Sequence, residues 1–332
     1  MPRLALSTEW TFHGLRVLTL ENELLRIQIL PEAGAKIWQI TYLPLGEDLL
    51  WNNPLTPPAR HAIHTRYDDV WSGGWDELFP NDEETVIEGE RYPDHGELWS
   101  GSWSYETYHN EDAISVTLRF QTPISCIAIQ KTITLRKGSA CIQFEHCMRN
   151  LSAVRFPFLW KLHPALKVTS EHRIDFPNMK VVREPSFPGT LGEAPTEFAW
   201  PYANAGDKIL DLRQVPEEKE REIHFFYGAD MADGWCALTN IAKQISCGLR
   251  FDQKIFGSCW LFASYGGWRN HQVAVLEPCT GYPLNFEQMV AAGRDRVLAP
   301  GESLSTEVLF SVQQGLKGVS SMDGNGIMQG LQ

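Results

Sequence analysis

The sequence GLRVLTLENELLRIQILPEAGAKIWQITYL, residues 14–43, contains three strand-length clusters of residues that favour β-structure. The clusters span residues 15–20, 24–30 and 36–42. Asn22 separates the first two, and Pro31 with Gly34 separates the second from the third. Because such residues interrupt regular pairing, the pattern predicts three short strands joined by turns.

The rest of the chain repeats this pattern of short strands. Over residues 113–120 apolar and polar residues alternate, which is the period of a half-buried strand. Further strands are predicted at residues 127–135, 141–148, 223–227, 235–240, 246–251, 258–262, 272–276 and 305–312, with a hairpin turn at 136–138 and a short helix at 286–292. Many short strands and few helical segments predict an all-β fold, a sandwich or a barrel.

The composition does not change abruptly along the 332 residues, and no repeat of fixed period occurs. We therefore predict a single domain over residues 1–314. Residues 315–332 are rich in Gly and Ser and are predicted to form a flexible C-terminal tail. Residues 177–207, which contain five prolines, are predicted to be a long irregular insertion.

Charge and cysteine content limit the classes of partner. A formal net charge of -12 argues against nucleic acid or an anionic membrane. The seven cysteines are dispersed and none belongs to a CxxC pair, which argues against a zinc site. Dispersed thiols and an N-terminus without a secretory pattern predict a cytoplasmic protein. Nothing in the sequence indicates an oligomeric state.

The segment WSGGWDELFPNDEETVIEGERYPDHGELW, residues 71–99, has no regular apolar period and is predicted to be a loop. It combines three Trp, a Gly pair and the step His95-Gly96. Two interpretations fit: the segment presents aromatic and polar groups to a ligand, or it is an acidic surface loop whose Trp residues fill the core. An exposed Trp would suit the flat apolar face of a sugar ring.

Motifs of several enzyme classes are missing. The sequence has no GxxxxGK[ST], no GxGxxG after a strand and no GxSxG, which argues against nucleotide binding and serine hydrolase chemistry. His61 and His64 lie close together, but no third metal ligand is evident.

Three residues remain as candidates for acid–base chemistry. His95 precedes Gly96, His163 precedes Pro164, and Glu277 follows an apolar strand. A Glu and a His on opposite sides of a ligand can exchange protons at neutral pH. The alternatives are an edge-strand charge for Glu277 and a satisfied core or turn residue for each histidine.

The order of motifs resembles the aldose 1-epimerase (galactose mutarotase-like) superfamily. The resemblance runs from about residue 18 to residue 312. It rests on the opening LTLENELLRIQILPEAGAKI, the Gly-Gly segment followed by PDHGELW, an apolar segment with His163 after Asn-Leu-Ser, a strand ending in Glu-Pro-Cys-Thr-Gly, and the turn APGES at 299–303.

The resemblance implies an antiparallel β-supersandwich that binds a pyranose. It implies that Glu277 is the base that takes the proton of the anomeric hydroxyl, and that His163 is the acid that protonates the ring oxygen. It implies that His95 orients the sugar by hydrogen bonding. The ring would open, the C1–C2 bond would rotate, and closure would invert the anomer, with no metal or organic cofactor.

One departure from the family concerns the substrate. A branch that acts on hexose 6-phosphates has Arg before the Gly pair, where this chain has Ser72. Without that guanidinium, and with nearby carboxylates to repel a phosphate, we predict a non-phosphorylated sugar as the partner. The carboxylates are Asp76, Glu77, Asp82, Glu83 and Glu84.

The sugar contacts are predicted to include His95, Asp76 and Trp75. The sugar-binding Asp and Arg of the family have no clear counterparts, and Glu222, His224 or Asp252 are candidates for the Asp.

Two other functions stay open at this point. The protein could be a non-catalytic carbohydrate-binding or sensing protein on the same scaffold, because fold does not fix function. A glycoside hydrolase or lyase would need two carboxylates about 5–10 Å apart, for which Asp76 or Glu77 could pair with Glu277.

Overall fold

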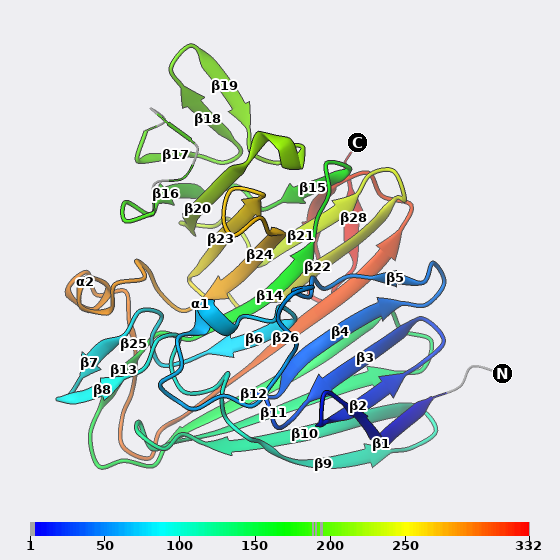
Figure 1. Ribbon diagram of the computed structural model, residues 1–332, viewed down its shortest axis with the longest axis vertical. Coiled ribbons are helices and arrows are strands. Elements are labelled where there is room, and N and C mark those ends of the chain that lie inside the picture. The colour runs from blue at the N-terminus through cyan, green and yellow to red at the C-terminus, as the bar shows by residue number, and fades with distance from the viewer. Residues whose placement is uncertain (1–3, 188, 190, 193–194, 332) are drawn as a thin grey trace. The chain divides into compact units, whose positions relative to one another are not determined.

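The computed structural model describes residues 4–187, 189, 191–192 and 195–331 (Figure 1). The chain forms two compact units, where the sequence predicts one domain over residues 1–314. Unit 1 comprises Met1–Pro164 and Thr280–Val308, and unit 2 comprises Ala165–Cys279 and Leu309–Gln332. Strands β14 (Lys161–Lys167) and β26 (Ser303–Gln314) have residues in both. Each unit is described by itself.

The first sheet of unit 1 is an antiparallel ladder with the order β1-β2-β3-β4-β6-β14, and β5 pairs with β4. The strands predicted from residues 14–43 are confirmed as β2, β3 and β4. The bounds are β1 (Ala5–Phe12), β2 (Leu15–Glu21), β3 (Leu25–Leu30), β4 (Lys36–Tyr42), β5 (Glu47–Asp48) and β6 (Trp75–Leu78).

The segment at residues 71–99 is not a plain loop, which corrects the prediction. It contributes β6 to the sheet and also contains the small hairpin of β7 (Thr85–Ile87) and β8 (Glu90–Tyr92). β6 escapes detection because its sequence, WDEL, has a carboxylate facing each side of the sheet.

The second sheet of unit 1 is the antiparallel meander β9-β10-β11-β12. The turn predicted at 136–138 joins β11 and β12 and is confirmed. The short helix at the predicted position is α2, which is capped by the Asn285 side chain. The bounds are β9 (Ser104–His109), β10 (Ala113–Gln121), β11 (Ile127–Arg136), β12 (Cys141–Asn150), β13 (Phe156–Phe158), β25 (Arg296–Leu298), α1 (Tyr67–Val70) and α2 (Phe286–Ala291).

Side chains from the two sheets meet in a core that contains a buried ionic cluster. Trp75 of β6 packs on Phe144 of β12 with ring centroids 4.8 Å apart. Glu77 Oε1 lies 2.9 Å from Lys131 Nζ and 3.1 Å from His146 Nε2. Burial raises the pKa of Glu77, but the charges of Lys131 and His146 outweigh burial and hold that pKa far below its ordinary value.

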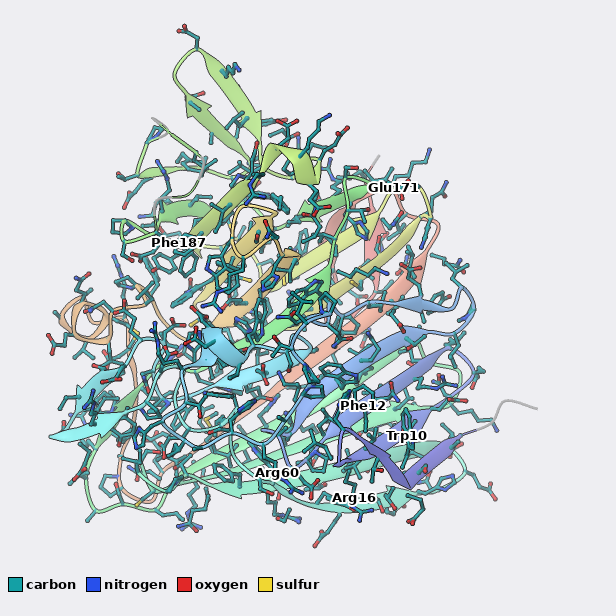
Figure 2. All side chains as sticks on the ribbon, viewed as in Figure 1. Trp10, Phe12, Arg16, Arg60, Glu171 and Phe187 are labelled. Carbon is teal, nitrogen blue, oxygen red and sulfur yellow. The ribbon has the colours of Figure 1, made fainter. Side chains whose placement is uncertain are left out.

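The strands at the N-terminal edge of unit 1 carry exposed and half-buried aromatic side chains (Figure 2). Trp10 and Phe12 lie on β1 with ring centroids 6.4 Å apart, and Phe12 lies 5.7 Å from Trp38 of β4. Nearby, Glu32 accepts hydrogen bonds from the Arg16 backbone and the Arg60 guanidinium. These contacts hold the turn between β3 and β4 against its neighbours.

Unit 2 is also built from antiparallel strands. One set has the order β24-β23-β20-β16-β17, and another has the order β15-β21-β22. The bounds are β15 (His172–Asp175), β16 (Lys180–Arg183), β17 (Glu197–Ala199), β18 (Tyr202–Ala205), β19 (Lys208–Asp211), β20 (Glu222–Ala229), β21 (Trp235–Asn240), β22 (Ile245–Phe251), β23 (Ser258–Tyr265), β24 (Gln272–Cys279) and the 3-10 turn η1 (Glu218–Glu220). The antiparallel, mostly β architecture confirms the predicted fold class.

Two predictions in unit 2 need correction. The segment at 177–207 is not simply irregular, because it contributes β16, β17 and β18. Residues 188, 190, 193 and 194 of that segment lie outside the described residues. The C-terminal segment forms a hairpin of β27 (Val319–Met322) and β28 (Met328–Gly330) in place of the predicted flexible tail.

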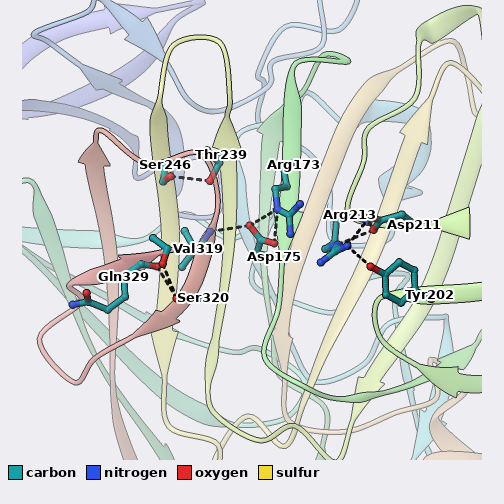
Figure 3. Close-up of polar contacts among 11 residues, drawn as sticks. Arg173, Asp175, Tyr202, Asp211, Arg213, Thr239, Ser246, Val319, Ser320 and Gln329 are labelled. Carbon is teal, nitrogen blue, oxygen red and sulfur yellow. Dashed lines mark hydrogen bonds and ion pairs between the residues drawn. The ribbon is translucent and has the colours of Figure 1, made fainter. Parts of the chain in front are cut away.

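Specific contacts anchor this C-terminal hairpin. Val319, Met322 and Met328 are buried against Trp235 and Ala237. The backbone N–H of Val319 donates to Asp175, which also accepts from Arg173 Nε (Figure 3). Apolar burial and a buried carboxylate therefore order residues whose Gly and Ser content suggested mobility.

Two features of the whole chain complete the description. All seven cysteines are free thiols. No helix among the described residues is long and apolar enough to span a membrane.

Candidate functional site

A cluster of polar and aromatic side chains lies on one face of the first sheet of unit 1. β6 and β14 pair so that Asp76 is directly opposite His163 and Glu77 is opposite Leu162. Because successive residues of a strand face opposite sides, Asp76 and His163 share one face while Trp75 and Glu77 face the sandwich core. The cluster lies on the face that carries Asp76 and His163.

His163 lies among aromatic rings. The ring of Tyr67, from α1, is 5.7 Å away and nearly perpendicular to it, and the ring of Trp71 is 5.6 Å away. The ring centroid of His95 is 6.4 Å from that of His163, with the planes at 90°. The structure therefore brings together His95 and His163, which are predicted from positions 68 residues apart in the sequence.

His95 owes its position to an unusual backbone conformation. His95 and Gly96 have φ angles of 60° and 71°, in the left-handed region that favours Gly. The backbone N–H groups of His95 and Glu97 donate to Asp82 O and Phe79 O, each at 2.6 Å. This turn holds the His95 ring on the ring of Tyr67, with a centroid distance of 4.3 Å and an interplanar angle of 15°.

The two histidines have opposite charge preferences. Burial alone would lower the pKa of His95, but the carboxylates of Asp82 and Asp94 outweigh it and raise that pKa. Burial lowers the pKa of His163 well below its ordinary value, and the positive charges of Lys161, His95 and Lys36 lower it further. Neighbouring groups whose pKa values are pushed apart are typical of acid–base sites.

The cations beside the histidines are paired with carboxylates. Lys36 Nζ lies 2.5 Å from Asp76 Oδ2, and Lys161 forms a buried ion pair with Asp82. Both pairs are almost fully buried. The site therefore carries fixed charges in balanced pairs.

Two residues predicted to contact the sugar, Trp75 and Asp76, are buried in the structure. Trp75 faces the core and packs on Phe144, so it lies on the opposite face of the sheet from His163. Asp76 is 1% exposed and its Oδ2 accepts hydrogen bonds from Lys36 and Tyr67, which makes it a supporting group. The reason in both cases is the period of two along β6.

The two glycines after Ser72, Gly73 and Gly74, have a packing role. Gly73 and Gly74 both have φ of 79°, and a Cβ on them would lie 2.3 Å from Trp51 O and 2.7 Å from Ile37 O. Gly73 O accepts a hydrogen bond from Lys36 Nζ at 2.7 Å. The Gly pair thus lets β6 approach its neighbours closely and helps to place Lys36.

Glu277 lies in unit 2. It is buried on β24, opposite Trp260 of β23, and Trp260 is opposite Tyr227 of β20. The Tyr227 hydroxyl donates to Glu184, a buried carboxylate that the sequence does not single out. The sequence predicts a strand that ends at residue 276, just before Glu277. In the structure β24 continues through Glu277 and Pro278 to Cys279.

The three candidates for a sugar-binding acid in unit 2 differ in their surroundings. Glu222 Oε2 lies 3.0 Å from His224 Nε2, so these two bind each other. Asp252 is exposed in a turn, where it accepts from the Lys254 backbone.

Tyr67, Lys36, Trp71 and Asp94 complete the cluster but were not predicted as site residues. No local pattern marks them, because their contact with His163 and His95 depends on strand register and on α1. The ion pair of Lys36 with Asp76 joins residues 40 positions apart. Among the residues that the structure describes, no group of three or more His, Cys, Asp or Glu side chains could hold a metal ion.

Gly96→Ala is expected to lower the free energy of unfolding by at least about 2 kcal/mol. The new Cβ would lie 2.0 Å from Phe79 O, and the left-handed φ would be strained. Urea unfolding measures the effect. Gly89→Ala is the matched control, because Gly89 has φ of 85° but no atom within 4 Å of the position that a Cβ would take. Equal losses in the two variants would show that the turn at His95 is not close-packed.

Solved structures of other proteins share this fold. A galactose mutarotase-like protein from Clostridium acetobutylicum has a TM-score of 0.66 at 13% identity, over 94% of this chain and 99% of that chain. A galactose mutarotase related enzyme from Lactobacillus acidophilus has a TM-score of 0.64 at 12% identity, over 90% and 97%. A TPR-domain containing protein from Parabacteroides distasonis has a TM-score of 0.62 at 16% identity, over 90% of this chain and 47% of that chain.

These likenesses establish a galactose mutarotase-like fold, as predicted from the order of motifs. Among curated proteins, no relative matches the sequence. A family model described as a domain of unknown function, DUF5107, matches residues 5–212. The chain belongs to the DUF5107 family.

Proposed function

We propose that this protein is an aldose 1-epimerase-like enzyme that interconverts the α and β anomers of a non-phosphorylated sugar. The observation that carries the proposal is the pair of His95 and His163, whose ring centroids lie 6.4 Å apart. The surroundings raise the pKa of His95 and lower the pKa of His163. Anomer interconversion needs one proton removed from a hydroxyl and one delivered to the ring oxygen, and therefore needs groups in different protonation states.

The charges around the histidines support a neutral substrate. The two lysines of the cluster, Lys36 and Lys161, are each paired with a buried carboxylate. A sugar phosphate would be bound best by a cation that is not already paired with a carboxylate, such as a guanidinium or a lysine facing the ligand. The uncharged hydroxyls of a free aldose need only hydrogen-bond donors and acceptors.

The roles of the individual residues are proposals from the resemblance. The resemblance assigns the two proton transfers to Glu277 and His163, and the orientation of the sugar to His95. The raised pKa of His95 makes this residue a second candidate for the proton donor. The reaction requires no metal or organic cofactor, since the chemistry consists of two proton transfers and the opening and closing of the ring.

Polarimetry on freshly dissolved single anomers tests the proposal. We expect the protein to accelerate mutarotation of at least one neutral aldose in a panel and to leave the corresponding 6-phosphates at their spontaneous rate. Acceleration of the phosphates alone would contradict the proposed substrate class. Calorimetric binding of a sugar without any acceleration would instead identify a carbohydrate-binding protein.

A further inference from the structure

Three side chains form a row across three neighbouring strands of unit 1. The pairing of Ile37 with Trp75 puts Lys36 of β4 beside Asp76 of β6, and Asp76 is opposite His163 of β14. All three are at least nine-tenths buried. Lys36 Nζ donates to Asp76 Oδ2 at 2.5 Å, which fixes Asp76 as a charged hydrogen-bond acceptor.

Tyr67 connects this row to the imidazole of His163. Its hydroxyl lies 2.7 Å from Asp76 Oδ2 and 3.3 Å from His163 Nδ1. A phenol has a single proton, and the short contact with an ion-paired carboxylate requires that this proton lie between Tyr67 and Asp76. The Tyr67 oxygen is then an acceptor toward His163, so Nδ1 must carry the hydrogen.

This assignment determines what the other ring nitrogen offers. In a neutral imidazole with Nδ1–H, Nε2 has a lone pair and accepts hydrogen bonds. His163 Nε2 has no hydrogen-bond partner within the described part of the chain. His95 is held differently, because its Nδ1 contacts the Asp94 carboxylate at 2.9 Å.

We propose that Lys36, Asp76 and Tyr67 are positioning residues that hold His163 as the neutral Nδ1–H tautomer, so that Nε2 accepts a proton from a sugar hydroxyl. This inference rests on the proposed function and changes one role in it. His163 enters the reaction as the proton acceptor, whereas the resemblance implies an acid.

The proton and electron movements balance. The Nε2–H bond of His163 forms as the O–H bond of the anomeric hydroxyl breaks, and the freed electron pair makes the C1=O1 bond. The C1–O5 bond breaks with its electrons on O5. O5 takes a proton from a second group, the His95 imidazolium or a carboxylic acid. Ring closure on the other face reverses each transfer.

The charged groups that face His163 favour the neutral imidazole. Lys36 on β4 and Lys161 on β14 are cationic, and His95 lies across from the ring. Asp76 on β6 is the carboxylate of the row, and it is neutralised by Lys36. Tyr67 on α1 contributes an uncharged hydroxyl. The surroundings thus agree with the tautomer that the hydrogen bonds require.

NMR of protein with ¹⁵N-labelled histidine tests the tautomer without any sugar. The His163 signals are identified as those lost in His163→Asn. At neutral pH we expect Nδ1 to show a one-bond proton coupling and Nε2 to show none. Tyr67→Phe should reduce the Nδ1–H population at least several-fold. Tyr92→Phe, which removes a hydroxyl from another buried tyrosine of unit 1, should leave it unchanged.

The outcomes separate this inference from the proposed function. A protonated Nε2 with a bare Nδ1, or two protonated nitrogens, in the wild-type protein would overturn the inference even if anomers interconvert. If Tyr67→Phe fails to fold, the wild-type spectrum alone decides the tautomer. If the tautomer is as expected but no sugar is turned over, the proposed function fails while the positioning of His163 stands. In an active enzyme, Tyr67→Phe should lower kcat about tenfold or more with little change in KM.

Discussion

Glu77→Gln is expected to lower the free energy of unfolding by about 3–5 kcal/mol. The substitution keeps the shape of the side chain but removes the negative charge that Lys131 and His146 share in the core of unit 1. Lys131 would then be a buried cation without a counter-charge, and the desolvation of that cation would no longer be offset. Urea unfolding of both proteins at neutral pH measures the difference.

The pH dependence of this difference follows from the pKa of Glu77, which is held far below its ordinary value in the folded protein. A carboxyl with a depressed folded-state pKa stabilises the fold above its ordinary pKa, and this stability is lost as the pH falls toward the folded-state value. The deficit of Glu77→Gln should therefore be constant near neutrality and should shrink below a pH of about 4.5.

Glu84→Gln is the matched control for this prediction. Glu84 also pairs with a cation, Arg91, but both side chains are exposed. Water screens such a pair, so its loss should cost less than about 1 kcal/mol. If Glu77→Gln were as mild as Glu84→Gln, the ionic cluster would not contribute to holding the two sheets together.

Glu277→Gln is expected to reduce the rate of anomer interconversion by about 10²- to 10⁴-fold. An amide cannot give or take a proton, but it keeps the size and much of the hydrogen bonding of the carboxyl. Sugar affinity measured by calorimetry should therefore change only a few-fold. Glu197→Gln, at an exposed position in the same unit, should leave both rate and affinity unchanged.

The Glu277 result also identifies the second proton-transfer group. An undiminished rate in Glu277→Gln would remove Glu277 from proton transfer and leave His95 as the donor to the ring oxygen. In that case His95→Asn should show the large loss in its place.

Much of the fold could be predicted because most strands carry their pattern in their own residues. β2, β3, β4 and the hairpin of β11 and β12 have apolar clusters bounded by Gly, Pro or Asn, and the structure confirms them. β6 could not be predicted in this way. Its Asp76 and Glu77 are buried because they form ion pairs with Lys36 and Lys131, which lie far away in the sequence.

The C-terminal hairpin shows the same limit. Three apolar residues are scattered among Gly and Ser, and their burial depends on Trp235, which is more than 80 positions away in the sequence. Local composition contains no information about such a partner.

Only part of the candidate site could be predicted, because some of its residues meet through contacts between segments that are distant in the sequence. His95 stands out because it precedes Gly96, and His163 because it precedes Pro164 in an apolar segment. The structure brings the rings of these two histidines together. Tyr67 and Lys36 reach them only through the register of β4, β6 and β14 and the position of α1. The sequence does not show that Trp75 faces the core, because the face of a strand cannot be known until the strand is recognised.

The exchange rate between the α and β anomeric signals of a neutral aldose at equilibrium tests most directly whether His163 takes part in anomer interconversion. Exchange NMR on the sugar that responds in polarimetry measures this rate with wild-type protein and with His163→Asn at equal concentration. We expect exchange well above the spontaneous rate for the wild type and a loss of about 10²- to 10⁴-fold in the variant. Equal rates for the two proteins, at or above the spontaneous value, would contradict the assignment of this histidine cluster as an active site.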